Sequence, residues 1–325
     1  MRNITFSEAI NEALREEMLK NPDIFIMGED VGYAGGVRGV TKGLLEEFGD
    51  DRVRDTPISE ATIVGAGVGA AITGLRPVVE IMYSDFLGIA GDEVFNKMAK
   101  WRYMHGSSMK VPMVLRTSCG GGFGGAAEHS QTLEALFMHI PGLQVIYPTT
   151  AYDAKGLLKA ALNDDNPTLF LEHRLLYKAR GEVPEEEYTI PFGQADIKRE
   201  GTDITVVAVG YEVPAAIAAA DKLKDQGISV EVIDLRTLVP LDKATILKSV
   251  EKTGRLLVAE EGHKTNGVGA EIAAIAAEEA IYYLEGPVGR VAALDVPIPY
   301  SPPMESYVLP NEEKIIKGIK DTLKG

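Results

Sequence analysis

Apolar runs of strand length alternate with stretches of helical periodicity through the first part of the chain. The runs are nearly continuous in apolar residues, as in strands that are buried on both faces. Helices are expected at 7–19, 85–104 and 152–162. Strands are expected in "DIFIMGED" (23–30), "RPVVEIM" (76–82), "VPMVLRTS" (111–118), "QVIYP" (144–148) and "PTLFLEH" (167–173). This alternation predicts an α/β domain whose parallel sheet is covered on both faces.

A charged segment interrupts the pattern, which then starts again. Residues 181–198 carry Pro184 and Pro191 and show no sustained periodicity, so we interpret them as a linker. The pattern therefore predicts two parallel-sheet α/β domains, at 1–180 and 199–325. In the second domain, strands are expected in "DITVVAVG", "SVEVIDL", "RLLVAEE" and "RVAALDV", and helices at 213–226, 241–251, 269–283 and 311–323.

The composition argues against several classes of function. The 325 residues include 48 acidic residues and 33 Lys and Arg, a formal net charge of −15, which disfavours binding to nucleic acid or to an anionic membrane. No run of about eighteen apolar residues is present, so no membrane span is expected. Cys119 is the only cysteine and the N-terminal pattern is that of an amphipathic helix, so we expect a cytoplasmic protein without disulfides.

The stretch "ISEATIVGAGVGAAITG" allows two interpretations. Gly65, Gly67 and Ala70 fit the G-x-G-x-x-G/A pattern of dinucleotide-binding units, with Glu80 as the acidic residue, which would make the chain an NAD- or FAD-binding protein. The match is weak, because Glu80 lies nearer than the usual spacing of about twenty residues. Alternatively, Gly65 and Gly69 share one face of a helix and allow another helix to approach closely.

Glu60 and the glycines after it match a motif of thiamine-diphosphate enzymes, in the domain that binds the aminopyrimidine ring. Longer matching segments follow one another in order: "FIMGEDVG", "GVTKGL", "FGDDRVRDTPISE", "AEHSQTLEALFMHIPGLQVIYPTTAYDAKGLLKAAL" and "DLRTLVPLD". Together they resemble the β subunit of the decarboxylating first component of 2-oxo acid dehydrogenase complexes, a family with pyruvate, branched-chain and acetoin members. The resemblance covers nearly the whole chain. It implies a transketolase-like pyrimidine-binding domain followed by a transketolase C-terminal-like domain.

The same resemblance assigns catalytic and cofactor-binding roles to three residues. Glu60 would hydrogen-bond a nitrogen of the aminopyrimidine ring and control a proton there, a role that suits a carboxyl among apolar neighbours. Phe86 would pack on that ring, and His129 would stand at the entrance of the cofactor cleft and assist substrate binding or acyl transfer. Taken alone, the three could equally be a helix-start carboxylate, a core aromatic residue and a loop histidine. Many relatives have Gln where Glu128 stands, and a carboxylate there would favour the charged imidazole if the two side chains meet.

The resemblance also implies metal ions and a partner chain. The segment "ALNDDNP" is similar to a potassium-binding loop, although Asn and Asp before a proline also simply end helices. Its oxygen ligands would be the carbonyls of Met113, Ala161 and Leu162, with Asp164 and Asn166. The family's magnesium motif, which binds the cofactor's diphosphate, has no counterpart in this sequence. We therefore expect an α subunit to supply magnesium and the diphosphate half of the site, in an α2β2 heterotetramer.

The reaction implied by the resemblance is thiamine-dependent oxidative decarboxylation of a 2-oxo acid, with pyruvate preferred and with acyl transfer to lipoyl. Acetoin cleavage with acetyl transfer is the alternative within the family. The second domain shows no catalytic cluster, and we expect His263 to be a loop residue. We expect this domain to serve assembly and, through its negative charge, docking of the basic subunit-binding domain of the lipoyl acyltransferase core.

Overall fold

The computed structural model describes all 325 residues, which divide into two compact units. The first unit comprises Met1–Cys119 and Leu136–Phe192, and the second comprises Gly120–Ala135 and Gly193–Gly325. The sequence pattern places the glycine-rich segment Gly120–Ala135 in the first domain. The structure groups it with the second unit, where its backbone N–H groups donate hydrogen bonds to two carboxylates.

A parallel sheet forms the centre of the first unit. Its strands follow the order β6-β7-β5-β4-β2-β3, and every neighbouring pair is parallel. Every residue of β5 and β7 is buried, as expected for strands that are covered on both faces. The strands are β2 Ile24–Gly28, β3 Val53–Asp55, β4 Arg76–Ile81, β5 Val114–Cys119, β6 Gln144–Ile146 and β7 Thr168–His173.

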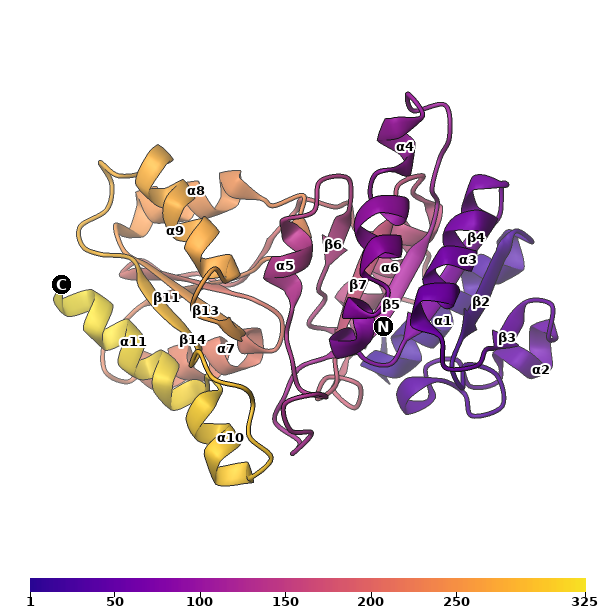
Figure 1. Cartoon of the computed structure of the whole chain (residues 1–325). Coiled ribbons are helices and arrows are strands. Elements are labelled where there is room, and N and C mark those ends of the chain that lie inside the picture. Colours follow the sequence, from indigo (N-terminus) through magenta and orange to yellow (C-terminus); the bar gives the residue numbers. More distant parts are fainter. The chain divides into compact units, whose positions relative to one another are not determined.

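Helices α1 (Phe6–Lys20), α3 (Glu60–Ile72) and α6 (Ala151–Asn163) flank this sheet (Figure 1). The start of α1 is fixed by a capping box, in which the side chains of Thr5 and Glu8 exchange hydrogen bonds with each other's backbone N–H groups. Along its length α1 packs on α6. The shorter helices are α2 Leu44–Phe48, α4 Trp101–Met104 and α5 Glu134–Met138, with a 3₁₀ turn at Val37–Gly39.

The prediction of a single long helix at 85–104 is wrong. The chain instead forms a 3₁₀ turn at Ser84–Gly88, a π-helical turn at Glu93–Met98 and then α4. Gly88 and Gly91 lie within this stretch, and glycine in a helix interior costs about 1 kcal/mol relative to alanine. The apolar periodicity is therefore real, but the backbone that carries it is not one regular helix.

The second unit contains a smaller sheet of order β14-β13-β10-β11-β9. All its pairs are parallel except β9, which runs antiparallel to β11 at the edge. The strands are β9 Asp196–Arg199, β10 Ile204–Ala208, β11 Val230–Asp234, β13 Leu256–His263 and β14 Gly289–Ala293. The short strand β12, Thr237–Val239, is not part of this sheet. The helices are α7 Glu212–Lys224, α8 Lys243–Thr253, α9 Val268–Glu279, α10 Pro302–Val308 and α11 Glu312–Lys324.

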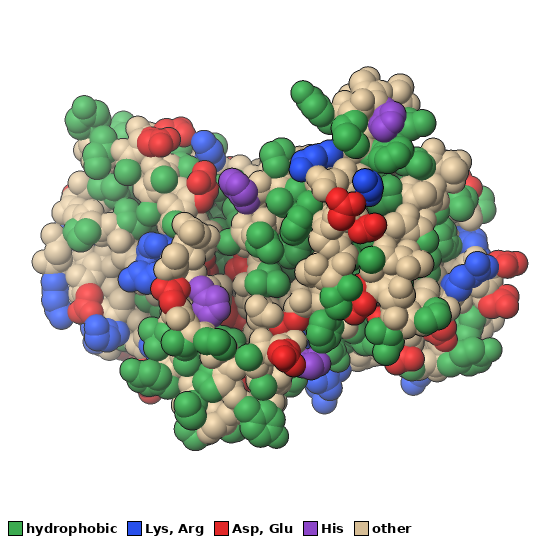
Figure 2. All heavy atoms as spheres, viewed as in Figure 1, with side chains coloured by type: hydrophobic (Ala, Val, Ile, Leu, Met, Phe, Trp, Pro, Cys, Tyr) green, Lys and Arg blue, Asp and Glu red, His purple; other side chains and the backbone are tan.

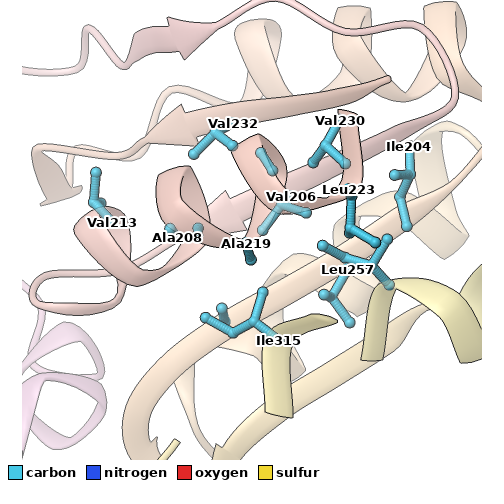
Figure 3. Close-up of a cluster of buried hydrophobic side chains, with 14 residues drawn as sticks. Ile204, Val206, Ala208, Val213, Ala219, Leu223, Val230, Val232, Leu257 and Ile315 are labelled. Atoms are coloured by element: carbon cyan, nitrogen blue, oxygen red, sulfur yellow. The ribbon is translucent and has the colours of Figure 1, made fainter. Parts of the chain in front are cut away.

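The core of the second unit lies between this sheet and helices α7 and α11 (Figure 3). Val206 and Leu257 from the sheet pack against Ala219 and Leu223 of α7 and Ile315 of α11, and all five are fully buried. The side of each helix that faces the sheet carries these apolar residues at helical spacing. The predicted α/β layering of the second domain follows from this pattern.

Residues 181–198, interpreted as a linker, contain parts of two strands. β8 (Arg180–Val183) pairs antiparallel with β1 (Arg2–Thr5), and β9 joins the second sheet. Both strands are short and only partly buried. Short edge strands of this kind leave little hydrophobic periodicity in the sequence.

None of the helices combines the length and the apolar character that crossing a membrane requires. On the face drawn in Figure 2, Lys and Arg side chains form small separate groups and no extended basic patch.

Candidate active site

The carboxyl ends of β4, β2 and β3 lie at one edge of the first unit's sheet, because these strands are neighbours and parallel. Glu29 follows the last residue of β2, and Glu60 begins the helix that follows β3. Phe86 lies in the 3₁₀ turn directly after β4. Ligands of open α/β sheets bind at this edge. The fold thus places the predicted Glu60 and Phe86 at the expected edge, together with Glu29.

Glu60 is the first residue of α3, and only 7% of it is exposed. Ser59, the residue before it, caps no backbone group; its hydroxyl donates to Thr62 Oγ1 at 2.8 Å. Ile63 and Val64, on the next turn, are buried. An acid in the first turn is stabilised by the helix dipole. The helix-start interpretation and the cofactor-binding interpretation therefore describe one and the same position.

Glu29 is a second buried carboxyl at this edge, and the sequence pattern alone assigned it no role. Burial raises the pKa of Glu29, and the negative charges of Glu60 and Asp30 raise it further. The two glutamates therefore interact electrostatically, and Glu29 keeps its proton to a higher pH than an exposed glutamate does. One sequence signal was available: an acidic residue directly after a buried parallel strand.

The residues at this edge fit an aminopyrimidine ring, which offers ring nitrogens, an amino group and an aromatic face. Glu29 Oε1 and Thr56 Oγ1 are buried and have no hydrogen-bond partner within the chain. A buried polar atom without a partner costs about 1–3 kcal/mol, which a polar ligand would relieve. Phe86, half-buried, supplies an aromatic surface.

Arg116, on β5, joins three strands of the sheet through buried ion pairs. Its Nη1 atom lies 2.6 Å from Glu80 Oε2 on β4, and its Nε atom lies 2.7 Å from Glu172 Oε1 on β7. Tyr177 donates its hydroxyl to Glu172 at 2.8 Å, and the Val37 N–H donates to Glu80 at 3.1 Å. Burial disfavours the charge of Arg116, but the two carboxylates outweigh it and raise the pKa of the guanidinium. This network ties the loop after β2 to the sheet.

The structure contradicts the dinucleotide-binding alternative. Gly65 and Gly67 lie inside α3, whereas the phosphate-binding glycines of that motif form the turn between a strand and a helix. A Cβ atom at Gly67 would come within 2.8 Å of Met113 Cε and 2.9 Å of Val79 Cγ1, so this glycine serves packing. Glu80 is buried in its ion pair with Arg116 and is not available to a ribose.

The two glycines proposed as a packing face have different surroundings. A Cβ atom at Gly65 would lie 3.3 Å from Glu93 Cγ, because α3 packs on the turn Glu93–Met98 of its own chain. A Cβ atom at Gly69 would meet nothing within 4 Å. Close packing by the chain itself thus explains Gly65, whereas Gly69 lies at an open part of the helix surface.

His129 belongs to the glycine-rich segment of the second unit. Its N–H lies 3.5 Å from the carbonyl of Ala126, a non-glycine residue with a φ of +60°. The histidine is half-buried, and Glu128 before it is exposed. His263, expected in a loop, is instead the last residue of β13, and its Nδ1 atom lies 2.8 Å from the Leu294 carbonyl. Nothing in these contacts gives His263 a catalytic partner.

The oxygens of the predicted potassium loop already accept hydrogen bonds within the chain. Arg76 Nη1 donates to the carbonyls of Leu162 at 3.2 Å and Asp164 at 2.9 Å. The carbonyl of Met113 accepts from the Thr168 N–H at 2.9 Å. Every carbonyl oxygen has a second lone pair, so these hydrogen bonds leave each of them one acceptor position for a cation.

The side chains of the loop are more fully engaged than its carbonyls. Asp164 Oδ1 accepts from both the backbone and the side-chain amide of Asn166, and Asn166 Oδ1 accepts from Arg102 at 2.6 Å. The Ala161 carbonyl accepts from the Asp164 N–H at 3.2 Å. No cluster of three or more His, Cys, Asp or Glu side chains in the structure could hold a metal ion. A cation in this loop would therefore be bound by carbonyl oxygens.

Two family models match the chain almost from end to end. Residues 2–180 match the pyrimidine binding domain of transketolase, and residues 193–315 match the transketolase C-terminal domain. The chain is 48% identical to the beta subunit of acetoin:2,6-dichlorophenolindophenol oxidoreductase from Bacillus subtilis (strain 168), over 97% of this chain and 96% of the relative. The chain belongs to the β-subunit family of the thiamine-diphosphate-dependent 2-oxo acid and acetoin dehydrogenases.

Two further relatives of this β-subunit family carry other names at nearly equal identity. The chain is 44% identical to the 2-oxoisovalerate dehydrogenase subunit beta of Bacillus subtilis, over 99% of both chains. It is 46% identical to the pyruvate dehydrogenase E1 component subunit beta of Staphylococcus epidermidis, over the full length of both. Membership of the family makes this chain an enzyme subunit and implies thiamine diphosphate as its cofactor. The family predicted from the motifs is confirmed.

A solved structure supports the fold. The split-gene transketolase in its inactive beta4 tetramer aligns with a TM-score of 0.82 over 99% of both chains, at 24% sequence identity. Together with the two domain matches, this confirms the predicted fold class: a transketolase-like pyrimidine-binding domain followed by a transketolase C-terminal-like domain.

Proposed function

We propose that this β subunit serves a pyruvate dehydrogenase, in which pyruvate is oxidatively decarboxylated and the acetyl group passes to lipoyl. The observation that supports catalysis most directly is the pair Glu29 and Glu60: two buried carboxyls at the carboxyl edge of the sheet, one with an oxygen that nothing in the chain satisfies. Support for pyruvate comes from the full-length match to a pyruvate dehydrogenase β subunit.

Thiamine diphosphate, when bound, supplies the electron sink for cleavage of the bond beside the substrate carbonyl. In our proposal, Glu60 hydrogen-bonds a nitrogen of the aminopyrimidine ring and exchanges a proton at that nitrogen. Burial and the charges of Glu60 and Asp30 raise the pKa of Glu29, so Glu29 keeps its proton to a higher pH than an exposed glutamate does. Phe86 packs on the face of the ring and fixes its plane.

His129 is the proposed substrate-side residue. An imidazole can hold or transfer a proton near neutral pH, and the glycines before His129 let the backbone approach a ligand closely. We assign it to substrate binding or to the transfer of the acyl group to lipoyl.

An α subunit is the proposed partner that completes the site. This chain offers groups for the aminopyrimidine ring, and we assign magnesium and the diphosphate-binding half to the α subunit of an α2β2 heterotetramer. The open surface of α3 at Gly69 would admit a closely packed helix of that partner. Potassium, held by the carbonyls of Met113, Ala161, Leu162 and Asp164, would brace the end of α6.

The second unit offers a surface for the acyltransferase core. A hollow of about 600 Å³ on this unit is lined by Asp203, Glu251 and Glu285 and by the exposed Tyr282 and Tyr283. Its two basic residues already form ion pairs with acidic neighbours. Exposed tyrosines beside acidic groups suit a small basic domain, so we propose this hollow as the docking site of the subunit-binding domain.

Acetoin is the second candidate substrate, and one observation favours it. The acetoin oxidoreductase β subunit of Bacillus subtilis shares 48% identity with the chain, slightly more than the pyruvate dehydrogenase relative does. Both substrates leave a two-carbon unit for lipoyl, so the same residues of this chain would serve either reaction.

Rates on three substrates test the proposed function. The chain is co-expressed with its α partner, supplied with thiamine diphosphate and magnesium, and assayed on pyruvate, acetoin and a branched 2-oxo acid with an artificial electron acceptor. We expect kcat/KM to be highest for pyruvate. If kcat/KM is highest for acetoin, acetoin becomes the proposed substrate in place of pyruvate. No activity on any of the three would refute the proposal.

Glu60→Gln tests the proton role within the same complex. Gln keeps the shape of the side chain but cannot exchange a proton, so we expect kcat to fall by about 10²–10⁴-fold. Glu212→Gln is the matched control, because Glu212 is also buried and also begins a helix, in the second unit. A Glu60→Gln complex with the activity of that control would show that Glu60 transfers no proton.

A further inference from the structure

Two carboxylates of the second unit hold the glycine-rich segment that carries His129. Glu305, on α10, accepts the Gly122 N–H with Oε1 at 2.8 Å and the Gly124 N–H with Oε2 at 3.0 Å. Glu261, on β13, accepts the Gly121 N–H at 2.8 Å and the Thr132 hydroxyl at 2.7 Å. Only 3% of Glu305 and 6% of Glu261 are exposed, so both acceptor carboxylates are buried.

The backbone of the segment is shaped to receive a carboxylate. Gly120, Gly122 and Gly124 have φ values of +91°, +84° and +75°, which a residue with a side chain rarely adopts. In this conformation the N–H groups of Gly122 and Gly124 both donate to Glu305, whereas the N–H of Gly121 donates to Glu261. A Cβ atom at Gly121 would come within 2.8 Å of Leu309 Cδ1, so the segment also lies directly against the end of α10. A side chain at Gly121 would break this contact.

The same segment determines where His129 stands. Its ends are joined by a hydrogen bond of 3.3 Å from the Gly120 N–H to the Gln131 carbonyl, and Ser130 is buried. Between these ends the chain forms neither helix nor strand. The hydrogen bonds to Glu305 are among the contacts that fix the outer part of the segment, while its tip at Gly122 and Phe123 is exposed.

We propose that Glu305 is a positioning residue for His129: by binding the N–H groups of Gly122 and Gly124 it holds the segment in the conformation in which His129 acts. This rests on the role given to His129 in the proposed function. Each hydrogen bond to a charged acceptor contributes about 1.5–3 kcal/mol. Loss of one by substitution corresponds to about a 10–100-fold change in an equilibrium or a rate.

Hydrogen exchange and the reactivity of His129 test the structural part in the α2β2 complex. Glu305→Gln keeps the volume but turns an amide NH₂ toward one of the two N–H groups. We expect exchange at Gly122 and Gly124 to become at least about tenfold faster, and acylation of the His129 ring by diethyl pyrocarbonate to change in rate. The Gly120 amide should stay protected, and Lys317→Ala, at an exposed ion pair of α11, should change none of these. Unchanged exchange and unchanged acylation would overturn the proposal.

A double-mutant cycle tests the link to catalysis. If Glu305 acts through His129, Glu305→Gln lowers kcat by about 10–100-fold in the wild type and has little further effect in a His129→Ala background. Equal losses in both backgrounds would show a purely structural role and overturn the proposal. Glu305→Asp keeps the charge with a shorter side chain and should recover part of the activity, which covers the case in which Glu305→Gln folds poorly.

The two hypotheses fail in different ways. A complex without activity on any of the three substrates would remove the proposed function, yet the exchange and acylation measurements would still decide whether Glu305 holds the segment. If the complex is active but exchange at Gly122 and Gly124 is equally fast in Glu305→Gln and in the wild type, only the positioning role is refuted.

Discussion

Two groups of buried acids, one in each unit, have opposite kinds of neighbours. In the first unit, Glu80 and Glu172 share the buried guanidinium of Arg116, and the charges compensate one another. In the second unit, Glu134 and Glu212 are equally buried but have other carboxyls as neighbours. Burial, and then the charges of Glu260 and Glu261, raise the pKa of Glu134 to about 8. Burial and Glu261 raise the pKa of Glu212 to about 8.

The difference shows two ways in which an acid can be kept out of water. A buried carboxylate with a bidentate cationic partner joins secondary-structure elements, as Glu172 does between β7 and β5. Burial raises the pKa of Glu172, and the charge of Arg116 opposes this rise. A carboxyl without such a partner lacks this opposition and keeps its proton to a higher pH. The second arrangement makes the stability of its unit depend on pH.

Removing the shared cation should have the largest effect. Arg116→Met leaves Glu80 and Glu172 buried without a positive partner, which costs about 3–5 kcal/mol of unfolding free energy. Denaturant unfolding measures this loss. The triple variant Arg116→Met, Glu80→Gln, Glu172→Gln removes the stranded charges and should recover much of it. Equal stability of Arg116→Met and the wild type would show that the ion pairs do not support the sheet.

The stability of the second unit should depend on pH, because Glu134 is buried without a cationic partner. The native pKa of Glu134 is about 8, above the ordinary value of 4.5. The folded state therefore binds more protons between these values, and stability falls as pH rises toward 8, by about 1.4 kcal/mol per pH unit for one such carboxyl. Glu134→Gln has no proton to lose, so its unfolding free energy should fall less between pH 6 and pH 8. If the unfolding free energies of variant and wild type change with pH in parallel, the raised pKa of Glu134 is contradicted.

Removing an exposed ion pair should change stability least, and this provides the baseline. Lys317 and Asp321 on α11 lie 2.6 Å apart with most of both side chains in water. Solvent and salt screen such a pair, so Lys317→Ala should leave the denaturation midpoint nearly unchanged. A shift as large as that of Arg116→Met would mean that burial is not what separates the two units.

The predicted elements were those whose residues carry a strong local pattern. The strands at 111–118 and 167–173 and the helices at 7–19 and 152–162 correspond to β5, β7, α1 and α6. Strands buried on both faces are nearly continuous apolar runs, and amphipathic helices repeat every 3.6 residues. Among the elements that went unpredicted, β1, β8, β9 and α10 are short and only partly buried. The turns at Ser84–Gly88 and Glu93–Met98 share a helical apolar pattern but not a regular helical backbone.

The candidate site likewise contains residues that a local motif indicates and residues that only the fold brings together. Glu60 and Phe86 belong to a local motif that the sequence displays directly. Glu29 becomes a site residue only because the parallel order β4-β2-β3 brings the ends of strands distant in sequence to one edge. Glu80 shows the opposite case: its spacing after the glycines suggested a ribose contact, and only its pairing with Arg116 revealed a buried ion pair.

The sequence by itself determined the family and the two α/β domains and made Glu60 a candidate site residue, because these follow from residue types at short range and from the order of motifs. Only the tertiary structure decided which distant residues meet: Arg116 with Glu172, Glu29 with Glu60, and Glu305 with Gly122 and Gly124. The physical reason is that hydrogen bonds and ion pairs act over a few ångströms. Sequence periodicity records which face of an element is buried, but not which partner lies against it.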